Sequence, residues 1–428
     1  MLDIKVIRQN PESIKEACKK RGLDFDVEKL IELDTKKREL LQEIEGLKAQ
    51  QNKLGKDEIP QAQALKEEIK TKEPLLKETD EQLQKLLHEL PNIPQEDVPA
   101  GREEANVVLR KIGKLPKFSF EPKDHLALGE ALDVIDVERA TKVSGSRFAY
   151  IKGDLVLLEF ALVRMAMDYA AKEQFIPIIP PVLIRKEMMK DMGYIDTKED
   201  LAERYFLEKE NMFLVGTAEQ SVGPMHQGEI LEEKELPKRY VAFSTSFREE
   251  AGSYGKDTKG ILRVHQFDKV ELFSFCHPAK SREEHKFLVS FEEKLWQALD
   301  IPYQVVQLAA GDMSRPAVST IDIEAWLPGH PSTGSTSSRQ ANSGPLGKYR
   351  EVSSASNTTD FQARRLDIRF KNKEGKLEFV HMLNATGFPI GRTLIAIMEN
   401  YQQKDGSIEI PKALQKYVGK KKITGRVD

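Results

Sequence analysis

Two consecutive runs of apolar residues with heptad spacing limit what residues 28–90 can form. The first covers 33–54 and the second 65–90, each in alternating steps of four and three, with Gly55 and Pro60 between them. Such spacing predicts two helices that pack against each other along their apolar faces. Because only a short turn at Gly55 and Pro60 separates them, the two helices are expected to form an antiparallel hairpin. At a rise of about 1.5 Å per residue, each helix would be roughly 40 Å long and too slender for a globular core. The hairpin is therefore expected to form an arm.

The chain continues well beyond this arm. Pro74 lies inside the second run, where a proline removes an amide donor and usually kinks a helix. A Pro-rich, polar stretch at 91–101, PNIPQEDVPAG, then marks a domain boundary. Since 428 residues exceed one ordinary core, we predict two domains, an N-terminal one over 1–101 that carries the arm and a second over 102–428.

Composition narrows the class of protein. Hydrophobic residues make up 39% and charged residues 32% of the chain, which excludes a wholly disordered protein. The net charge of −3 does not by itself require a polyanionic partner. Two distant cysteines, Cys18 and Cys276, exclude a disulfide framework and a four-thiolate zinc site. The start, MLDIKVIRQN, lacks an apolar segment and the apolar run LVLLEFALV contains Glu159, so we expect a cytoplasmic protein without membrane association.

Residues 102–428 carry both helical and strand patterns. A long helix is predicted over 154–173, and FIPIIPPVL at 175–183 predicts an edge strand interrupted by prolines. The segments RYVAFST, LRVHQFDKVELFSF, YQVVQLAA, STIDIEAWL and KYREVSS predict further strands. Together they indicate an α+β domain, an antiparallel sheet with helices on one side. Residues 329–346 are rich in Gly, Ser, Thr and Pro and predict a long loop between two strands.

The segment FSTSFREEAGSYGKDTKGILRVHQFDKVELF predicts strand, polar loop and strand, with Arg248 and Glu250 on the first strand. Because alternate residues of a strand point the same way, Arg248 could hold phosphate oxygens while Glu250 accepts from an amine or hydroxyl. The alternative for an Arg-x-Glu pair is an ion pair on the sheet surface. His265 on the return strand is expected to be a structural residue and not a general base.

This segment resembles the second of three motifs of class II aminoacyl-tRNA synthetases, in which a Phe-Arg-x-Glu strand leads through a loop to a second strand. The strand ending at Pro180-Pro181 resembles the first motif, and GFPIGRTLIAIMENYQ resembles the third. Within the class, GTAEQ, AGSYGKDTKGILRVHQFDKVE, KYREVSS, TDFQARR and the hairpin are similar to bacterial-type seryl-tRNA synthetases. The resemblance implies an antiparallel β-sheet catalytic domain flanked by helices, with an N-terminal antiparallel two-helix coiled-coil arm.

The resemblance also implies a reaction. It implies a ligase that activates L-serine with ATP and Mg²⁺ and transfers the seryl group to the 3′ end of tRNA(Ser), and it leaves charging of tRNA(Sec) open. Arg248 would hold the α-phosphate and the serine carboxylate, and Glu250 would contact the adenine end of ATP. Arg392 would hold the γ-phosphate, with Glu351 as the third catalytic residue. Glu351 and Ser354 would hold the Mg²⁺. The ATP-binding positions it implies are Arg248, Glu249, Glu250, Glu351, Val352, Ser353, Ser354 and Arg392.

Two of these positions have simpler explanations. Glu351 could be a solvated strand carboxylate, and Arg392 a surface arginine. A cation at the start of a helix is unfavourable unless an anion sits there too, so the place of Arg392 before TLIAIMEN favours a phosphate partner.

The resemblance assigns serine binding to Thr217, Ala218, Glu219, Arg248, Glu271 and Thr386. Glu271 and Thr386 would hydrogen-bond the serine hydroxyl. Alanine would leave these groups unpaired and be rejected by a factor of about 10⁴. The alternative for Thr217 and Glu219 is that they cap a helix.

The arm is not basic. Residues 28–90 contain twelve Lys and Arg against fifteen Asp and Glu, which from charge alone indicates a solvated coiled coil for protein contacts. The resemblance implies instead that the arm reaches across a homodimer to the long variable arm of tRNA(Ser), which is recognised by shape. The phosphate contacts we predict are Lys36, Lys37, Arg38, Lys48, Lys53 and Lys56.

Three other functions compete with this one. A non-catalytic homologue that binds tRNA or a partner through the arm would not need to keep all five of Arg248, Glu250, Glu271, Glu351 and Arg392. An amino-acid:carrier-protein ligase on the same catalytic fold would lack the long arm. A coiled-coil scaffold leaves the three ordered motifs unexplained.

Overall fold

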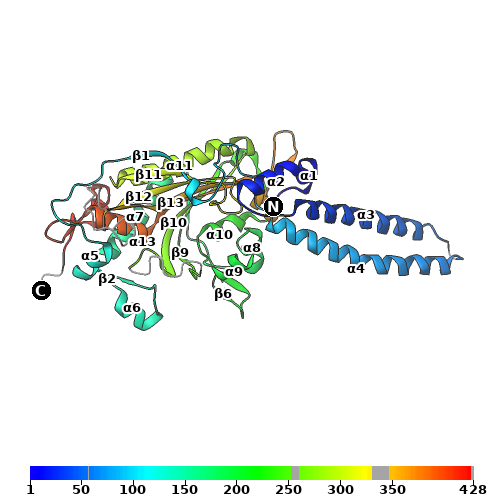
Figure 1. The fold of residues 1–428 in the computed structure, drawn as a ribbon, viewed down its shortest axis with the longest axis horizontal. Coiled ribbons are helices and arrows are strands. Elements are labelled where there is room, and N and C mark those ends of the chain that lie inside the picture. The colour runs from blue at the N-terminus through cyan, green and yellow to red at the C-terminus, as the bar shows by residue number, and fades with distance from the viewer. Residues whose placement is uncertain (56, 252–259, 330–346, 426–428) are drawn as a thin grey trace.

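An eight-stranded sheet lies at the centre of the computed structural model, which describes residues 1–55, 57–251, 260–329 and 347–425 (Figure 1). Neighbouring strands are antiparallel, except that the edge strand β4 runs parallel to β9. This confirms the predicted antiparallel sheet with the Pro-rich strand at its edge. In sheet order the strands are β1 (Val107–Ile112), β11 (Tyr303–Gln307), β12 (Ser319–Leu327), β13 (Lys348–Thr359), β16 (His381–Pro389), β10 (Gln266–Cys276), β9 (Lys238–Phe247) and β4 (Ile176–Ile178).

Helices cover both faces of the sheet, whereas the sequence predicted helices on one side. In β10, Val270 and Leu272 point into the main core, and Phe273 and Phe275 point into a second apolar cluster on the other face. The main core includes α7 (Asp154–Lys172), α11 (Ser281–Ala298) and α13 (Ile390–Asn400), and the second cluster includes residues of or next to α8 (Lys186–Asp191), α10 (Glu219–Val222) and α12 (Phe361–Leu366). These last three helices have only four to six residues, too few to show a helical period in the sequence.

Short elements complete the described part of the chain. No helix in it has the length and apolar character that crossing a bilayer requires. The predicted loop at 329–346 lies, apart from Gly329, outside the described residues. The remaining helices and strands are α1 (Ile4–Gln9), α2 (Pro11–Lys20), α5 (His125–Ala131), α6 (Val137–Ser144), α9 (Lys198–Ala202), α14 (Lys412–Val418), β2 (Ile135–Asp136), β3 (Tyr150–Ile151), β5 (Leu183–Arg185), β6 (Phe206–Leu207), β7 (Met212–Leu214), β8 (Ile230–Glu232), β14 (Arg369–Lys371), β15 (Leu377–Phe379), β17 (Ile408–Glu409) and β18 (Lys422–Ile423).

The predicted arm is present. Helices α3 (Val27–Gln51) and α4 (Ile59–Glu89) pack along each other and project from the rest of the molecule (Figure 1). An ion pair of 2.7 Å between Lys37 and Asp80 joins the two helices and explains a lysine at a seam position. Helix α4 continues through Pro74, so the proline does not end it.

Two buried polar side chains fix the base of the arm to the sheet. Arg21, which follows α2, donates to the main-chain carbonyls of Asn92 at 3.1 Å and Ala310 at 3.3 Å. The amide of Asn92 donates in turn to the carbonyl of Pro316 at 2.9 Å. The Pro-rich stretch at 91–101 is therefore packed against the sheet domain and is not a free tether.

Candidate functional site

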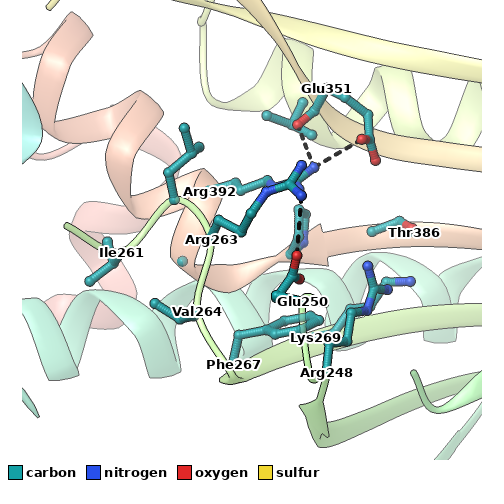
Figure 2. Close-up of a pocket in the computed structure, with 14 residues that line it drawn as sticks. Arg248, Glu250, Ile261, Arg263, Val264, Phe267, Lys269, Glu351, Thr386 and Arg392 are labelled. Atoms are coloured by element: carbon teal, nitrogen blue, oxygen red, sulfur yellow. Dashed lines mark hydrogen bonds and ion pairs between the residues drawn. The ribbon is translucent and has the colours of Figure 1, made fainter. Parts of the chain in front are cut away.

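A pocket opens beside the ends of β10, β13 and β16 (Figure 2). Lys269 of β10 and Thr386 of β16 point into it. Phe267, Val352, Ile261 and Leu262 give it apolar walls. The charged residues that line it are Arg248, Glu250, Arg263, Lys269, Glu351 and Arg392.

Arg248 holds its place through contacts outside the strand. Its Nε donates to the carbonyl of Gly216 at 3.2 Å, and its guanidinium lies 5.1 Å from the centre of the Phe267 ring. Burial, together with the positive charges of Arg204 and Arg392, lowers the pKa of Arg248. Several guanidinium groups thus crowd one pocket, which favours an anionic ligand such as a phosphate.

Glu250 is not on the strand, and this corrects the sequence prediction. Strand β9 ends at Phe247, and Glu250 has a φ of 53°, which ends the alternation that was expected to align Arg248 with Glu250. Glu250 forms an ion pair with Arg263 at 3.2 Å, and both line the pocket (Figure 2).

Arg392 lies in the first turn of α13 and faces Glu351 of β13 (Figure 2). Its Nη1 is 3.1 Å from a carboxylate oxygen of Glu351 and 2.9 Å from the main-chain oxygen of the same residue. The positive charge of Arg392 lowers the pKa of Glu351, so this carboxylate is ionised at neutral pH. The Glu351 side chain is 51% exposed and can reach a ligand in the pocket.

The other predicted ATP-binding residues fall into two groups. Val352 lines the pocket, whereas the Ser353 hydroxyl accepts a hydrogen bond from the Trp296 indole at 3.0 Å and so faces the core beneath the sheet. Ser354 lies opposite Asp322 in the sheet register and hydrogen-bonds it. Glu249 does not line the pocket, and its amide donates to a carbonyl outside the pocket.

Glu271 and Thr386 face each other across β10 and β16, so the structure brings together the two residues predicted to hold the serine hydroxyl. Burial raises the pKa of Glu271 to about 7, although Lys269 opposes this effect. Lys269 forms an ion pair with Glu271 and donates to the Thr217 hydroxyl at 3.2 Å. The sequence interpretation missed Lys269, although its spacing of two from Glu271 on a strand places it on the same face.

The turn before α10 contributes a second carboxylate. Ala218 is the residue that precedes the helix, and it makes no side-chain cap. Glu219 is 5% exposed, accepts from the Gln362 amide at 3.4 Å and is hydrogen-bonded by Tyr194. Burial raises the pKa of Glu219. The hydroxyl of Thr217 accepts from the Glu219 amide at 3.4 Å, which is a contact of the capping kind, and it also accepts from Lys269. Capping therefore accounts for part of the role of Thr217 but not for the buried carboxylate of Glu219.

His265 has a structural contact, as predicted. Its ring Nδ1 lies 3.0 Å from the main-chain oxygen of Arg248. This contact joins the end of β9 to the start of β10, and His265 does not line the pocket.

The predicted Mg²⁺ site offers few protein ligands. Within the described ranges no group of three or more His, Cys, Asp or Glu side chains is arranged to hold a metal ion. Glu351 nevertheless offers an ionised and partly exposed carboxylate, and Ser354 a hydroxyl on the same strand. Mg²⁺ is commonly bound by one or two protein oxygens plus substrate phosphates, so these two residues suit it.

The predicted tRNA contacts on the arm differ in their surroundings. Lys37, Arg38 and Lys48 form ion pairs with acidic residues of the arm, the last with Glu73 at 2.8 Å. Lys36 and Lys53 are exposed and form no ion pair with any described residue, whereas Lys56 lies outside the described residues. Exposed ion pairs are worth little, so those on the arm can exchange for phosphates.

The fold and pocket match a known class of enzymes. The protein-family model described as tRNA synthetase class II core domain (G, H, P, S and T) matches residues 205–401 of this chain. These residues include all the charged residues of the pocket. The model of the seryl-tRNA synthetase N-terminal domain matches residues 1–94. The sheet domain is therefore that of a class II aminoacyl-tRNA synthetase.

Relatives over the full length define the family. The chain is 45% identical to a serine–tRNA ligase of Dictyoglomus turgidum, over 98% of each chain. The crystal structure of seryl-tRNA synthetase from Pyrococcus horikoshii complexed with ATP is 38% identical, with a TM-score of 0.90 over 100% of each chain. That of a cytoplasmic serine-tRNA ligase from Naegleria fowleri with AMP is 33% identical, with a TM-score of 0.87 over 100% of this chain and 99% of that one. The chain belongs to the seryl-tRNA synthetase family.

Proposed function

We propose that this chain activates L-serine with ATP to seryl-adenylate and transfers the seryl group to the 3′ end of tRNA(Ser). The observation that carries the proposal is that cationic side chains and polar side chains suited to an amino acid lie at one pocket. Arg248 and Arg392 line the pocket and provide cations for phosphates. Thr386 also lines it and pairs with the buried Glu271 of the neighbouring strand, which gives a small polar amino acid two polar partners. The names of the relatives and the adenine nucleotides in the two solved structures support the same reaction.

In the first step an oxygen of the serine carboxylate attacks the α-phosphorus. The new carbon–oxygen–phosphorus link forms as the bond from the α-phosphorus to the bridging oxygen breaks, and pyrophosphate leaves with the electron pair. Arg248 neutralises the charge that develops on the α-phosphate, and Arg392 holds the γ-phosphate. Glu250, positioned by Arg263, contacts the adenine end of ATP. When bound at Glu351 and Ser354, Mg²⁺ would offset the negative charge of the phosphates.

Serine is selected by buried polar groups. Glu219 and Glu271 receive the ammonium, and Thr386 with Glu271 bonds the hydroxyl. Lys269 limits the negative charge of this carboxylate pair through its ion pair with Glu271. A substrate without the hydroxyl leaves these groups unpaired inside the protein. Its kcat/KM is therefore expected to be lower than that of serine by a factor of about 10⁴.

In the second step a terminal ribose hydroxyl of the tRNA attacks the adenylate carbonyl, and AMP leaves. We propose that residues 1–101 form the tRNA-binding domain and 102–428 the catalytic domain. Lys36 and Lys53 are the most available phosphate contacts on the arm, and Lys37, Arg38 and Lys48 join them by exchanging their acidic partners.

We also propose a homodimer in the cytoplasm. Phe160 on α7 is 59% exposed and Ile179 after β4 is 83% exposed, and Leu157 and Ile176 on these two neighbouring elements are exposed as well. We call these four residues the apolar strip. Exposed apolar strips of this kind mark interaction surfaces. The two cysteines, Cys18 and Cys276, are free and buried, which supports a reducing compartment.

The decisive experiment is ATP–pyrophosphate exchange with a panel of amino acids, followed by charging of tRNA(Ser) and tRNA(Sec). We expect exchange with serine only, and charging of tRNA(Ser). Exchange without charging of any tRNA would favour a carrier-protein ligase. No serine-dependent exchange would rule out the proposed enzyme and favour a non-catalytic homologue.

A further inference from the structure

Helix α11 carries a buried carboxyl that the reaction above does not use. Glu292 is 0% exposed and belongs to the helix that packs beneath β13 and β16. Its neighbours Phe291 and Leu295 are part of the main apolar core. A carboxyl in such surroundings is costly unless it makes hydrogen bonds, so its presence requires an explanation.

Glu292 makes its hydrogen bond to the main chain of the serine pocket. Its Oε1 accepts from the Thr386 amide at 2.9 Å. Its Oε2 has no hydrogen-bond partner among the described residues. One side chain from below the sheet is therefore attached to the residue whose hydroxyl faces the substrate pocket above.

The sheet itself explains why the Thr386 amide needs a partner. The β10–β16 register shifts here, because Val270 pairs with Phe388 and Glu271 pairs with Thr386, which leaves Gly387 as an extra residue in β16. Such a bulge interrupts the ladder of hydrogen bonds and changes the direction of the neighbouring side chain. The bulge is tight, since a Cβ at Gly387 would lie 3.2 Å from a methyl carbon of Val270.

We propose that Glu292 is a positioning residue for serine selection, which holds the bulge through the Thr386 amide and so keeps the Thr386 hydroxyl opposite Glu271. The inference rests on the proposed function of the pocket. Burial, together with the nearby carboxyls Asp322 and Glu271, raises the pKa of Glu292 well above its usual range. The Oε1 atom of Glu292 accepts from the Thr386 amide, and the side-chain oxygen of a glutamine at this position could accept in the same way.

Two substitutions at this position separate the hydrogen bond from simple packing. Glu292→Gln keeps an acceptor of the same shape, and we expect its serine KM to stay within about twofold of the original. Glu292→Leu keeps the volume but loses the acceptor, and we expect it to raise the serine KM at least about tenfold with the ATP KM unchanged. Its preference for serine over alanine should fall as well. The measurement is ATP–pyrophosphate exchange with both substrates varied.

A matched control lies on the same helix. Glu284 is 5% exposed and binds Arg239 through two contacts of 2.7 Å, outside the pocket. Glu284→Gln should lower the melting temperature without changing the serine KM. If Glu292→Leu does not fold, Gly387→Ala tests the same bulge, because its Cβ crowds Val270, and it should also raise the serine KM selectively.

The outcomes are distinguishable. A folded Glu292→Leu with an unchanged serine KM would overturn the proposal, as would a glutamine variant as defective as the leucine variant. If only Gly387→Ala can be measured, an unchanged serine KM there would overturn it too. Exchange by the unsubstituted chain is measured first, because its absence with serine refutes the proposed function and not the role of Glu292 alone.

Discussion

Burial makes the charge of Glu271 depend on pH near neutrality. The pKa of this carboxyl is raised to about 7, so its ionised form, which we propose binds serine, disappears as the pH falls below that value. The effect on folding has the opposite sign. Because the folded pKa lies above the unfolded one, the folded state binds the extra proton, and the stability that this confers is lost as the pH rises from about 4.5 to 7.

We therefore expect kcat/KM for serine to rise with pH and to level off above 7. One pH unit below the pKa, at about pH 6, it should be about tenfold below the plateau. Glu271→Gln should lower the plateau and remove this slope. Serine-dependent exchange between pH 5.5 and 8.5 measures both, with kcat/KM for ATP as the control. A slope that persists in Glu271→Gln would assign the titration to another group.

At the level of elements, the arm depends on its root. Leu33, Leu83 and Leu87, at the base of α3 and α4, pack into one apolar cluster with residues of α1 and α2, and Arg21 attaches this cluster to the sheet domain. Burial lowers the pKa of Arg21 to about 10, which still leaves it charged at neutral pH. The arm is thus held by a rigid base.

Arg21→Met should loosen this base. It leaves several buried carbonyls without a donor, so we expect a loss of stability on the order of 3 kcal/mol. Charging of tRNA(Ser) should fall about tenfold because the arm loses its orientation, whereas serine-dependent exchange should change little. Thermal unfolding and the two activities measure this. Lys15→Met, which removes the exposed ion pairs of Lys15 with Glu12 of α2 and Glu28 of α3, is the control and should leave all three unchanged. An equal loss of exchange in Arg21→Met would argue against a specific role in the arm.

The elements also show how far the sequence could predict this structure. The hairpin, the long helix and the main strands follow from local periodicity. Of the charged residues of the pocket, motif resemblance predicts Arg248, Glu250, Glu351 and Arg392 but neither Arg263 nor Lys269. Glu250 was misplaced because a φ of 53° interrupts a strand pattern that the sequence continues. Lys269 could have been predicted, because alternate residues of a strand point the same way and Lys269 lies two residues before Glu271. The contacts of Arg21 and of Glu292, by contrast, join residues far apart in the chain and have no local pattern.

For the whole molecule, the direction of the arm matters. The arm projects away from the sheet domain, so its tip cannot touch the pocket of its own chain (Figure 1). Together with the apolar strip on α7 and β4, this geometry favours a homodimer in which the arm of one protomer guides tRNA to the pocket of the other. Phe160→Asp with Ile179→Asp should place charges in that strip and convert the dimer to monomers, as measured by light scattering. A dimer that survives both charges would place the interface elsewhere.

Mixed dimers test the direction of the arm directly. One protomer carries Arg248→Met and an intact arm, and the other has a working pocket but lacks the distal arm, residues 41–76, which spares the apolar root. Neither protomer alone should charge tRNA. If the arm acts across the dimer, random mixing should restore charging to about a quarter of the normal activity, because half of the dimers are mixed and each has one productive pocket. Serine-dependent exchange in the mixture should be about half of normal, which reports the number of working pockets. If the arm served the pocket of its own chain, the mixture would charge no tRNA, because every intact arm would be attached to an inactive pocket.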